Sequence, residues 1–598
     1  MKYPKLSELS TSREMIDVFK GYNHNLRIGD GEFFDMENLT SADYPVLSPR
    51  SQRGVYLTER NPQGMIAKDS LCYVDGGDFI INKHKVSLGL TVDKDDEGNI
   101  IPKNLISMGA YVIIMPDKKY INTADLSDFG DIEAYFEVSS DVSSEAYSEE
   151  PVKFTLCKVD GDNYGDIPCS DSPPDISNDE ATLWIDTSST PHVLKQYAHS
   201  SASWVSIATT YIKISAKGIG KPFNVDDGVY IDLGDDVDKA IADLNKAYMV
   251  IVDKTDDYIV VKGILDKVVE HTLGITVSRK MPNMDFIIES ENRLWGCRYG
   301  EAWNGQIVNE IYASKLGDFK NWYSFSSIST DSYVATVGTD GQFTGAITHL
   351  GYPLFFKENC IHKVYGNYPA NYQIQTTACR GVQKGSPKSL AIVNETLYYK
   401  STSGICAYDG SLPVEVSSAL GDVQYANAVA GVLGNKFYIS MADESEKYHL
   451  FVYDTRKGMW HREDDTKVTE FCTCRGELYF IDSDNQIKTV KGTGIKDTSM
   501  VRWMAETGIL GTDSPDKKYI SRIDIRLSLA VGSRVYIYAQ YDSLGAWEQL
   551  FAMSGKALKS FSAPIRPKRC DHLQLRIVGE GEAKIYSICK TIEQGSDI

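Results

Sequence analysis

The segment from Asp93 to Asn104 has the arrangement of acidic residues that comes nearest to a metal site. Asp93, Asp95 and Glu97 stand at the first, third and fifth positions of a calcium loop, and Gly98 stands at the sixth. The twelfth position, which should supply a bidentate glutamate, holds Asn104, and the flanking residues favour strands over helices. We therefore interpret the segment as an acidic hairpin turn, with adventitious calcium binding as the alternative.

A second cluster of carboxylates has the residue type that glycosidases use as general acid and base. It comprises Asp226, Asp227, Asp232, Asp235, Asp236 and Asp238. A glycosidase needs two carboxylates that face a cleft, and burial must raise the pKa of one of them. The local sequence supplies no apolar pocket for either group, so the cluster is predicted to form a solvated loop rim.

Sequence motifs of the common enzyme classes are missing. No segment has the spacing G-x-S-x-G, H-E-x-x-H or G-x-x-x-x-G-K-[ST]. The Asp-box of propeller sialidases, S-x-D-x-G-x-x-W, is not matched by its nearest phrases, DSPDKKY and YDSLGAW. We therefore expect no enzymatic activity, no cofactor and no bound metal, and a propeller glycosidase is the least favoured alternative.

Cysteine, histidine and tryptophan side chains show no ligand spacing. Cys472 and Cys474 form the closest pair of the 11 cysteines, but C-x-C suits zinc poorly and has no partner pair nearby. Reduced, buried thiols on strands are expected. The 10 histidines are scattered, so packing or surface roles are favoured over metal ligation. Core or interface anchors are predicted, with sugar-stacking platforms as the alternative, for Trp184, Trp204, Trp295, Trp303, Trp322 and Trp460.

The formal net charge of −20 restricts the class of partner. A field of this sign repels phosphate backbones, which disfavours general nucleic-acid binding by the outer surface. The segment from Ile565 to Arg576 is locally basic, so a basic lining inside an acidic ring stays open. No apolar run has the length of a signal-peptide core or of a membrane span. We expect a protein that is made and folded in a cytosol and does not cross a membrane by itself.

A recurring phrase, in which a polar turn separates two apolar-aromatic runs, indicates the elements that must position these residues. The clearest copy, NETLYYKSTSGICAYDG, runs from Asn394 to Gly410, and the later copies recur about every 40 residues. Each copy predicts a β-hairpin. Four-stranded blades at this spacing are typical of a β-propeller, and the copies predict about seven blades.

The spacing of the hairpins also locates an insertion. Leading strands start near Leu71 and Tyr111, a step of about 40, but the next one starts near Leu294, a step of about 183. Removal of about 140 residues restores the step to about 43. The intervening segment combines strand patterns with loops rich in Asp, Pro and Gly, so a small β-rich module is predicted between two blades.

The predicted fold class is all-β: a β-propeller of about seven blades, an inserted small β-rich domain and a C-terminal β-sandwich. Near the C-terminus, runs such as RIDIRLSL alternate apolar and polar residues, as do strands with one buried face and one solvent-exposed face. The N-terminal region is interpreted either as an arm along a neighbouring subunit or as a strand that closes the propeller ring. The predicted boundaries are 1–60 for the N-terminal arm, 61–135 for the first propeller blades, 136–278 for the inserted β-rich module or modules, 279–498 for the remaining blades and 499–598 for the C-terminal sandwich.

Both ends of the chain resemble virion structural proteins of tailed bacteriophages. The stretch FKGYNHNLRIGDGEFFDMENLTSADYPVLSPRSQRG is similar to the opening of such proteins, and SPDKKYISRIDIRLSL, SFSAPIRPKRCDHLQLRIVG and IYSICKTIEQGSDI are similar to their ends. In the insert, LWIDTSSTPHVLKQY is similar to a motif of phage tail and fibre proteins, and FNVDDGVYIDL with LNKAYMVIVDKTDDYIVV is similar to small barrel modules of virion proteins. The resemblance includes no catalytic motif, so no functional residue transfers.

The resemblance implies a non-enzymatic component of the neck or tail of a virion. Propeller-based hub or nozzle proteins of short-tailed phages, which this layout resembles, form rings beneath the portal around the DNA channel. The implied partners are further copies of the chain in a homo-oligomeric ring and other neck or tail proteins, with DNA passing through without specific binding. The implied location is the virion, after synthesis in the host bacterial cytoplasm. The alternative is a receptor-binding or glycan-binding tail protein.

Overall fold

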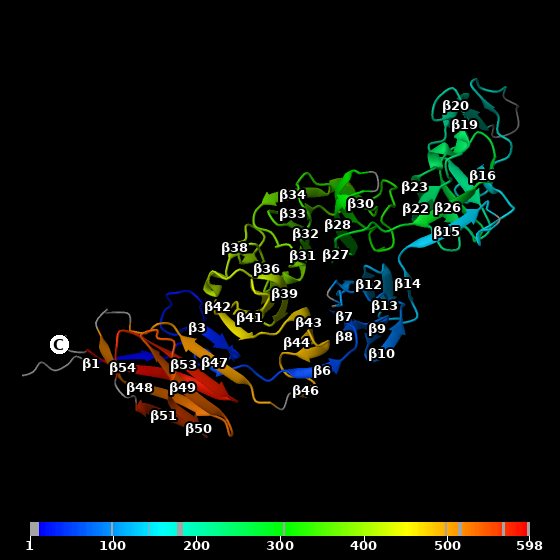
Figure 1. The fold of residues 1–598 in the computed structure, drawn as a ribbon. Helices are drawn as coiled ribbons and strands as arrows, with labels where there is room; N and C mark the ends of the chain where they lie inside the picture. Colours follow the sequence, from blue (N-terminus) through cyan, green and yellow to red (C-terminus); the bar gives the residue numbers. More distant parts are fainter. Residues whose placement is uncertain are drawn as a thin grey trace, which may run out of the picture.

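The computed structural model describes residues 11–96, 98, 100–141, 143–175, 183–302, 305–496, 499–511, 517–555, 557–564 and 568–594, and the statements below concern these residues. Their regular structure is almost entirely β (Figure 1). The predicted fold class, a propeller with an inserted β-rich domain and a C-terminal β-sandwich, is confirmed. Four short 3-10 helices interrupt the strands: η1 (Lys239–Leu244), η2 (Pro369–Asn371), η3 (Pro387–Ser389) and η4 (Ser418–Leu420).

Seven four-stranded antiparallel units form the blades of the propeller: five are separate sheets, the sixth is part of a ten-stranded sheet and the seventh is part of a five-stranded one. Blades 1 to 3 consist of β7 (Pro62–Ala67), β8 (Leu71–Asp75), β9 (Asp78–Ile81) and β10 (His84–Ser87); β11 (Asn104–Met108), β12 (Tyr111–Met115), β13 (Lys119–Asn122) and β14 (Phe129–Asp131); and β27 (Phe286–Ser290), β28 (Arg293–Glu301), β29 (Ile307–Ala313) and β30 (Tyr333–Thr336). Blades 4 and 5 consist of β31 (Gly345–His349), β32 (Tyr352–Lys357), β33 (Cys360–Tyr365) and β34 (Gln373–Ala378); and β35 (Ala391–Val393), β36 (Thr396–Lys400), β37 (Ile405–Tyr408) and β38 (Val414–Glu415).

The last two blades join the propeller to the N-terminal part of the chain. Blade 6 consists of β39 (Ala426–Leu433), β40 (Lys436–Ala442), β41 (Tyr448–Asp454) and β42 (Met459–Asp464). Blade 7 consists of β43 (Val468–Cys474), β44 (Glu477–Asp482), β45 (Gln486–Thr489) and, from the N-terminal region, β6 (Gly54–Thr58), with β46 (Ile495–Lys496) beside it. Of the two interpretations of the N-terminal region, the pairing of β6 with β45 corresponds to the strand that closes the ring.

The blades form a ring through their innermost strands. Contacts run from β7 to β11, β27 and β31, and η3 joins β31 to β36 and β39. The strand β39 contacts β35 and β43, and β43 contacts β7 again. Blade 7 therefore combines strands from two distant parts of the sequence, which ties the end of the ring to its beginning. The predicted number of blades, about seven, agrees with this ring.

Apolar clusters fill the spaces between neighbouring blades. Leu354 and Phe356 of blade 4 pack with Leu397 and Tyr399 of blade 5, and all four are fully buried. Because successive strand residues point to opposite faces, Tyr398 packs toward blade 6 instead. The unbroken apolar runs of the repeat therefore bury both faces of each blade, and full burial of one such side chain contributes about 1.5–3 kcal/mol.

The insert between β14 and β27 contains two sheets and projects from one end of the molecule (Figure 1). The eight-stranded sheet has the order β15 (Ala134–Ser139), β26 (Gly274–Arg279), β22 (Gly228–Asp232), β23 (Ala247–Lys254), β24 (Tyr258–Lys262), β21 (Tyr211–Ser215), β16 (Val152–Cys157), β25 (Val269–His271). The four-stranded sheet, which we call the tip lobe, consists of β17 (Cys169–Ser170), β18 (Leu183–Asp186), β19 (Val193–Ala198) and β20 (Ser203–Ser206).

The two ends of the chain together build the sandwich at the other end of the molecule (Figure 1). One layer contains β1 (Thr11–Ile16), β54 (Ala583–Gln594), β48 (Lys518–Leu529), β51 (Ala557–Pro564) and β52 (Arg569–Cys570). The other contains β3 (Glu32–Glu37), β47 (Arg502–Thr507), β53 (Leu573–Glu580), β49 (Arg534–Tyr541) and β50 (Glu548–Ser554). A separate pair is formed by β4 (Leu39–Thr40) and β5 (Ser48–Pro49). Ile525 and Ile577, one from each layer, lie in the same buried cluster.

A short strand, β2 (Gly21–Tyr22), connects the propeller to the sandwich. It pairs with β42 of blade 6 on one side and with β3 of the sandwich on the other, so a single ten-stranded sheet runs from β39 to β50. Gly21 has a φ of +87°, and a Cβ there would lie 2.3 Å from the carbonyl oxygen of Trp460. Glycine is therefore required where the two sheets become one.

Replacement of Gly21 by alanine is expected to lower the free energy of unfolding by about 2–4 kcal/mol, because it combines backbone strain with a collision. Gly434→Ala is the matched control: its φ is +61° but nothing lies within 4 Å of the added Cβ, so a loss of about 1 kcal/mol is expected. Urea unfolding followed by circular dichroism measures both, and equal losses would contradict the role given to Gly21.

Two buried propeller histidines predict a loss of stability at mildly acidic pH. Burial, and then Lys436, lowers the pKa of His461 to about 3; burial, and then Lys357, lowers that of His362 to about 4. Below the ordinary pKa of about 6.5 the unfolded chain binds protons that the folded chain does not, so stability falls as pH falls. The slope for each histidine rises from about 0.7 kcal/mol per pH unit at pH 6.5 toward an upper limit of about 1.4 near pH 5.

Urea unfolding at a series of pH values measures that slope. In the variant His362→Gln the slope is expected to decrease by the contribution of one histidine. An unchanged slope in this variant would show that His362 does not carry the pH dependence.

Candidate functional site

The acidic segment near residue 93 has the backbone of a hairpin turn. The Ile101 N–H donates to the Asp93 carbonyl oxygen at 2.9 Å, and Lys94 bridges to Ile100. The Asp93 carboxylate lies 3.9 Å from the Lys103 amine. Glu97, the expected ligand at the fifth position, lies outside the described residues. Within the described part of the chain, no group of three or more His, Cys, Asp or Glu residues is arranged to hold a metal ion.

The carboxylates between residues 226 and 238 separate into two kinds. Asp235 and Asp238 form ion pairs with Lys246 and Lys267 at the surface, as the prediction of a solvated rim requires. The prediction is wrong for Asp227, which is only 2% exposed. Its burial depends on a partner loop about 90 residues later in the chain, which local sequence does not reveal.

Asp227 is the centre of a buried joint between the insert and blade 3. The Arg279 guanidinium donates to Asp227 Oδ2 at 2.5 Å, and Asn321 Nδ2 donates to Oδ1 at 2.9 Å. The Asn224 N–H also donates to Oδ2 at 2.9 Å, and Arg279 donates further to the Ile132 carbonyl at 3.1 Å. Because Asn321 belongs to the loop between β29 and β30, this fully partnered carboxylate joins the insert to the propeller.

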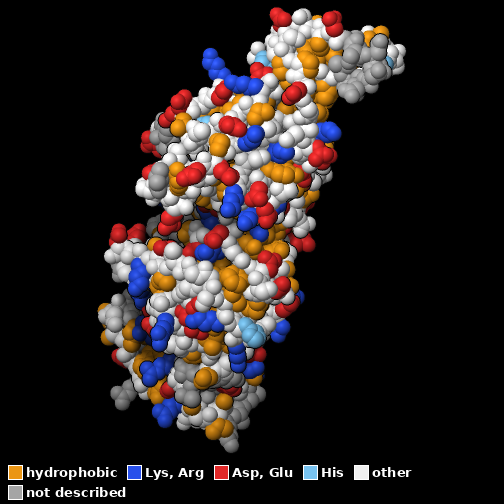
Figure 2. Space-filling model, turned by 90° about the vertical axis from the view of Figure 1, so that its right-hand side faces the viewer, with side chains coloured by type: hydrophobic (Ala, Val, Ile, Leu, Met, Phe, Trp, Pro, Cys, Tyr) orange, Lys and Arg blue, Asp and Glu red, His pale blue; other side chains and the backbone are white. Residues whose placement is uncertain are grey.

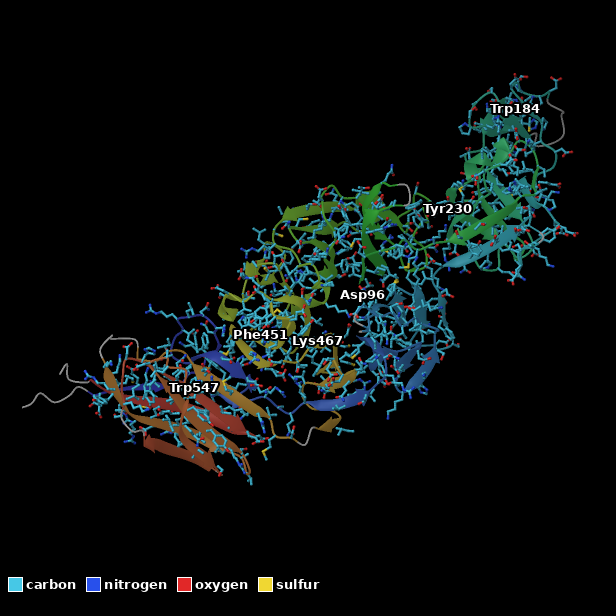
Figure 3. The ribbon with its side chains drawn as sticks, in the orientation of Figure 1. Asp96, Trp184, Tyr230, Phe451, Lys467 and Trp547 are labelled. Carbon is cyan, nitrogen blue, oxygen red and sulfur yellow. The ribbon has the colours of Figure 1, made fainter. Side chains whose placement is uncertain are left out.

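Aromatic stacking extends the joint. Tyr248 of the insert stacks on Tyr323 of blade 3, with 4.0 Å between ring centroids, and Tyr230 packs on Tyr248. Lys280 lies 4.7 Å from the centroid of the Tyr230 ring. A Cβ on Gly228 would lie 2.4 Å from the Tyr323 carbonyl oxygen, so the two backbones approach closely. Figure 3 labels Tyr230 on the side of the insert that faces the propeller. The joint therefore holds the insert in one orientation.

The tip lobe presents an aromatic face at the far end of the insert (Figure 3). Trp184, Lys195 and Tyr197 point to the same side of its sheet as Trp204, according to the strand register. Trp184 is buried against Trp204 at 5.3 Å between centroids, and Tyr197 packs on Trp204 at 5.4 Å. Trp204 is half-buried and His199, which packs on Tyr197, is exposed.

The other tryptophans singled out in the sequence are mostly core residues. Trp295, Trp322 and Trp460 are each 3% exposed or less, so the prediction of core anchors is confirmed for them. Trp303 lies outside the described residues.

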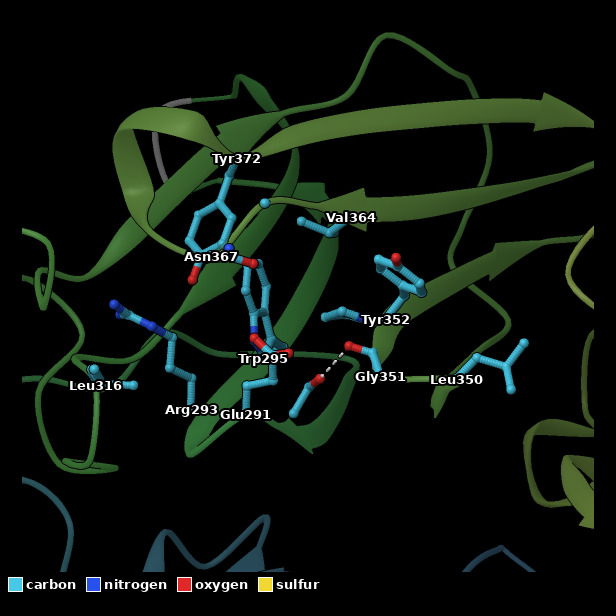
Figure 4. Close-up of a pocket in the computed structure, with 13 residues that line it drawn as sticks. Glu291, Arg293, Trp295, Leu316, Leu350, Gly351, Tyr352, Val364, Asn367 and Tyr372 are labelled. Atoms are coloured by element: carbon cyan, nitrogen blue, oxygen red, sulfur yellow. Dashed lines mark hydrogen bonds between the residues drawn. The ribbon is translucent and has the colours of Figure 1, made fainter. Parts of the chain in front are cut away.

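A pocket of about 210 Å³ opens between blades 3 and 4 (Figure 4). Its lining includes Glu291, Arg293, Trp295, Tyr352, Asn367 and Tyr372. Sequence reasoning selected Trp295 and missed Arg293, although the phrase NRLWGC places a charged residue at the start of a buried apolar run. A charged residue directly beside a buried apolar run is the feature of the sequence that could have indicated a buried arginine.

A second hollow, of about 680 Å³, lies between blade 7 and the sandwich. Beside it, Arg53 forms ion pairs with Glu463 at 2.7 Å and with Asp464 at 2.8 Å, and Arg50 lies 3.3 Å from Asp464. Burial acts to raise the pKa of Asp464, but Arg53 and Arg50 outweigh it and hold that pKa at about 2. This network fixes the segment between β5 and β6 against blade 6.

Comparisons with known proteins leave the function open. No family model matches the chain, and no curated protein matches it. Among solved structures, an exo-β-1,3-galactanase from Phanerochaete chrysosporium is 8% identical with a TM-score of 0.20 and covers 51% of this chain and 94% of its own. PorZ, a surface component of the type-IX secretion system of Porphyromonas gingivalis, is 11% identical with a TM-score of 0.25, covering 90% and 82%.

A sialidase from Trypanosoma rangeli is 8% identical with a TM-score of 0.20, covering 83% of this chain and 93% of its own. TM-scores of this size carry no argument about function. Among the described residues, no helix is long and apolar enough to cross a membrane.

Replacement of Asp227 by asparagine is expected to destabilise the joint by about 3–5 kcal/mol, because Arg279 is left buried without its counter-charge. Hydrogen exchange of the β22 and β26 amides, measured by mass spectrometry, reports this loss. Asp226→Asn is the matched control: the Asp226 carboxylate also pairs with a lysine of blade 3, Lys315, but it is 65% exposed, so its loss leaves no buried charge unpaired and is expected to cost about 1 kcal/mol or less. Similar exchange in both variants would contradict the structural role of Asp227.

Proposed function

We propose that this chain is a non-enzymatic structural component of a tailed-phage virion, located in the neck or tail. Several copies would form a hub-like or nozzle-like ring around the DNA channel, in contact with other neck or tail proteins. The chain would be made in the host bacterial cytoplasm and assembled into the particle.

The observation that carries this proposal is the common location of the two resembling ends. The segment that resembles the beginning of virion proteins contributes β3, and the segments that resemble their end contribute residues of β48 and β51–β54. These strands are far apart in the sequence but belong to one sandwich. A resemblance that converges on one folded unit supports a shared assembly module rather than scattered chance similarity.

The rigidity of the body also supports an assembly role. The ten-stranded sheet joins the propeller to the sandwich, and the Asp227 joint holds the insert, so three parts are held in fixed relation. A subunit of a closed ring must present its contact surfaces at fixed angles, because small errors accumulate around the ring. The insert and the sandwich, at opposite ends of the molecule, are available for contacts with different neighbours (Figure 1).

The charge of the surface suits a channel through which DNA moves. The net charge is −20, and on the face in Figure 2 acidic and basic side chains are interspersed. Phosphate backbones bind strongly where lysine and arginine gather and slide where they do not. DNA passage without specific binding is therefore part of the proposal.

A receptor-binding tail protein is the second candidate, and one observation favours it. The aromatic face of the tip lobe lies at the projecting end of the molecule, with Trp204 half-buried and His199 exposed. Tyrosine and tryptophan at exposed positions are typical of binding surfaces. In this candidate the tip lobe would contact the host surface. A propeller glycosidase remains the least favoured alternative.

Particle imaging of the purified full-length protein tests the ring. We expect closed rings of several copies by negative-stain electron microscopy, with a matching mass by native mass spectrometry, and the same protein in purified virions. A protein that is strictly monomeric and absent from virions would overturn the proposal. Binding to host cells by the monomer, lost in Trp204→Ala and retained in Tyr135→Ala, an exposed tyrosine on β15, would favour the receptor-binding candidate instead.

A further inference from the structure

The pocket between blades 3 and 4 has a buried cation at its base. Arg293 is 1% exposed, and its guanidinium donates to the carbonyl oxygens of Ser314 at 2.8 Å, Asp331 at 2.6 Å and Ser329 at 2.9 Å. These acceptors occupy Nη1 and Nη2. Among the described residues, none accepts from Nε and none forms an ion pair with Arg293.

Peptide carbonyls are therefore the direct partners of Arg293, and burial lowers its pKa although Tyr372 and the Asp331 carboxylate act to raise it. The Asp331 carboxylate forms no ion pair with Arg293: its Oδ2 accepts from the N–H groups of Ser326 at 2.7 Å and Ile328 at 3.1 Å, and its Oδ1 is buried without a hydrogen-bond partner. Buried charges in proteins are ordinarily paired, and a buried guanidinium is the side chain best suited to hold a carboxylate. Arg279, by contrast, has a counter-ion: the Asp227 carboxylate lies 2.5 Å from its guanidinium. The base of the pocket thus favours an anionic group.

The walls of the pocket are aromatic. Tyr372 packs edge-on against Trp295 at 5.0 Å between centroids, and the Arg293 guanidinium lies 5.9 Å from the Tyr372 centroid. Tyr352 lines the pocket near its mouth and is 36% exposed. Figure 4 shows these side chains around the same space. Flat aromatic side chains with polar tips suit a ligand that has an apolar face and a polar edge, as a pyranose ring has.

The rim of the pocket is polar. Asn367 is exposed on a loop held by Asn371, whose Oδ1 accepts from the N–H groups of Asn367 and Tyr368 at 3.0 Å. Glu291 is exposed on the turn between β27 and β28. The Asn367 amide can donate hydrogen bonds to hydroxyl groups and accept them, whereas the Glu291 carboxylate can only accept them. Glu291 is the one carboxylate in the lining, whereas glycoside hydrolysis uses two.

We propose that this pocket binds a sugar acid, with the ligand carboxylate at Arg293, its ring against the aromatic walls and its hydroxyl groups at Asn367 and Glu291. The volume of about 210 Å³ is below the range of about 300–1,000 Å³ that is usual for ligand pockets, so the pocket admits no more than one monosaccharide unit. The ligand is either a free monosaccharide or the terminal residue of a glycan. The site binds without hydrolysis. It goes beyond the proposed virion role and does not depend on it.

Ligand-observed NMR titration of the full-length protein tests the site. The probes are glucuronic acid, N-acetylneuraminic acid, neutral glucose and inorganic phosphate. We expect a dissociation constant near 1 mM, to order of magnitude, for at least one sugar acid, and binding at least about tenfold weaker for glucose and phosphate. A sialylated or glucuronylated oligosaccharide, titrated beside the free acid, distinguishes a glycan terminus from a free sugar.

Asn367→Asp places a negative charge at the rim without changing its shape, and it is expected to weaken binding of the acid about tenfold or more. The matched control is Asn359→Asp, in the exposed turn between β32 and β33 of the same blade, at the other end of these strands. This control is expected to bind normally. Arg293 is left intact because its guanidinium holds the loop that carries Ser314 and Asp331.

Tyr352→Ala provides a variant that tests the aromatic wall without touching the buried charge. It is expected to weaken binding of the acid severalfold while thermal unfolding stays close to that of the parent protein, since Tyr352 is partly exposed. Three results would each overturn the proposal: no binding of either acid, equal binding of acid and glucose, or the same affinity in Asn367→Asp and Asn359→Asp.

Discussion

Backbone hydrogen bonding through the two-residue strand β2 is the interaction on which the arrangement of the molecule depends. It lets the sheet of blade 6 continue into the sandwich, so the two parts share hydrogen bonds instead of only touching. The close approach of Gly21 to the Trp460 carbonyl makes this continuity possible. Ion pairs of Arg53 with Glu463 and Asp464 then hold the adjoining segment, which leads into the strand that completes blade 7.

Two buried arginines, Arg279 and Arg293, have different roles in this structure. Arg279 has a carboxylate partner, Asp227, and both oxygens of that carboxylate accept hydrogen bonds, so the pair acts as a joint. Arg293 donates to peptide carbonyls, forms no ion pair with a carboxylate among the described residues, and lies at the base of an open pocket. A buried charge with its counter-ion stabilises one arrangement of the chain, whereas one without it retains the capacity to bind an anion.

The repeating and the non-repeating parts of the molecule have different roles. The seven blades share one plan, bury both faces against their neighbours and form a rigid body. The insert and the sandwich do not repeat, and they lie at opposite ends of that body (Figure 1). A rigid core with two distinct ends is the form expected of a protein that connects neighbours within an assembly, which is why the virion role is proposed over catalysis.

The sequence by itself determined the strands, the blade repeat and the insertion, because alternation, apolar runs and turn residues act over a few neighbours. In Asn394–Gly410 all the residues that indicate a hairpin lie within one short segment. The insert was indicated by the step of about 183 residues between two successive hairpins, which is much longer than the usual step of about 40. Only the tertiary structure decided that β6 completes blade 7, that both chain ends share one sandwich, and that Asp227 and Arg293 are buried. These features depend on partners distant in the sequence, since burial and pairing are properties of the packed chain and not of the segment that carries the residue.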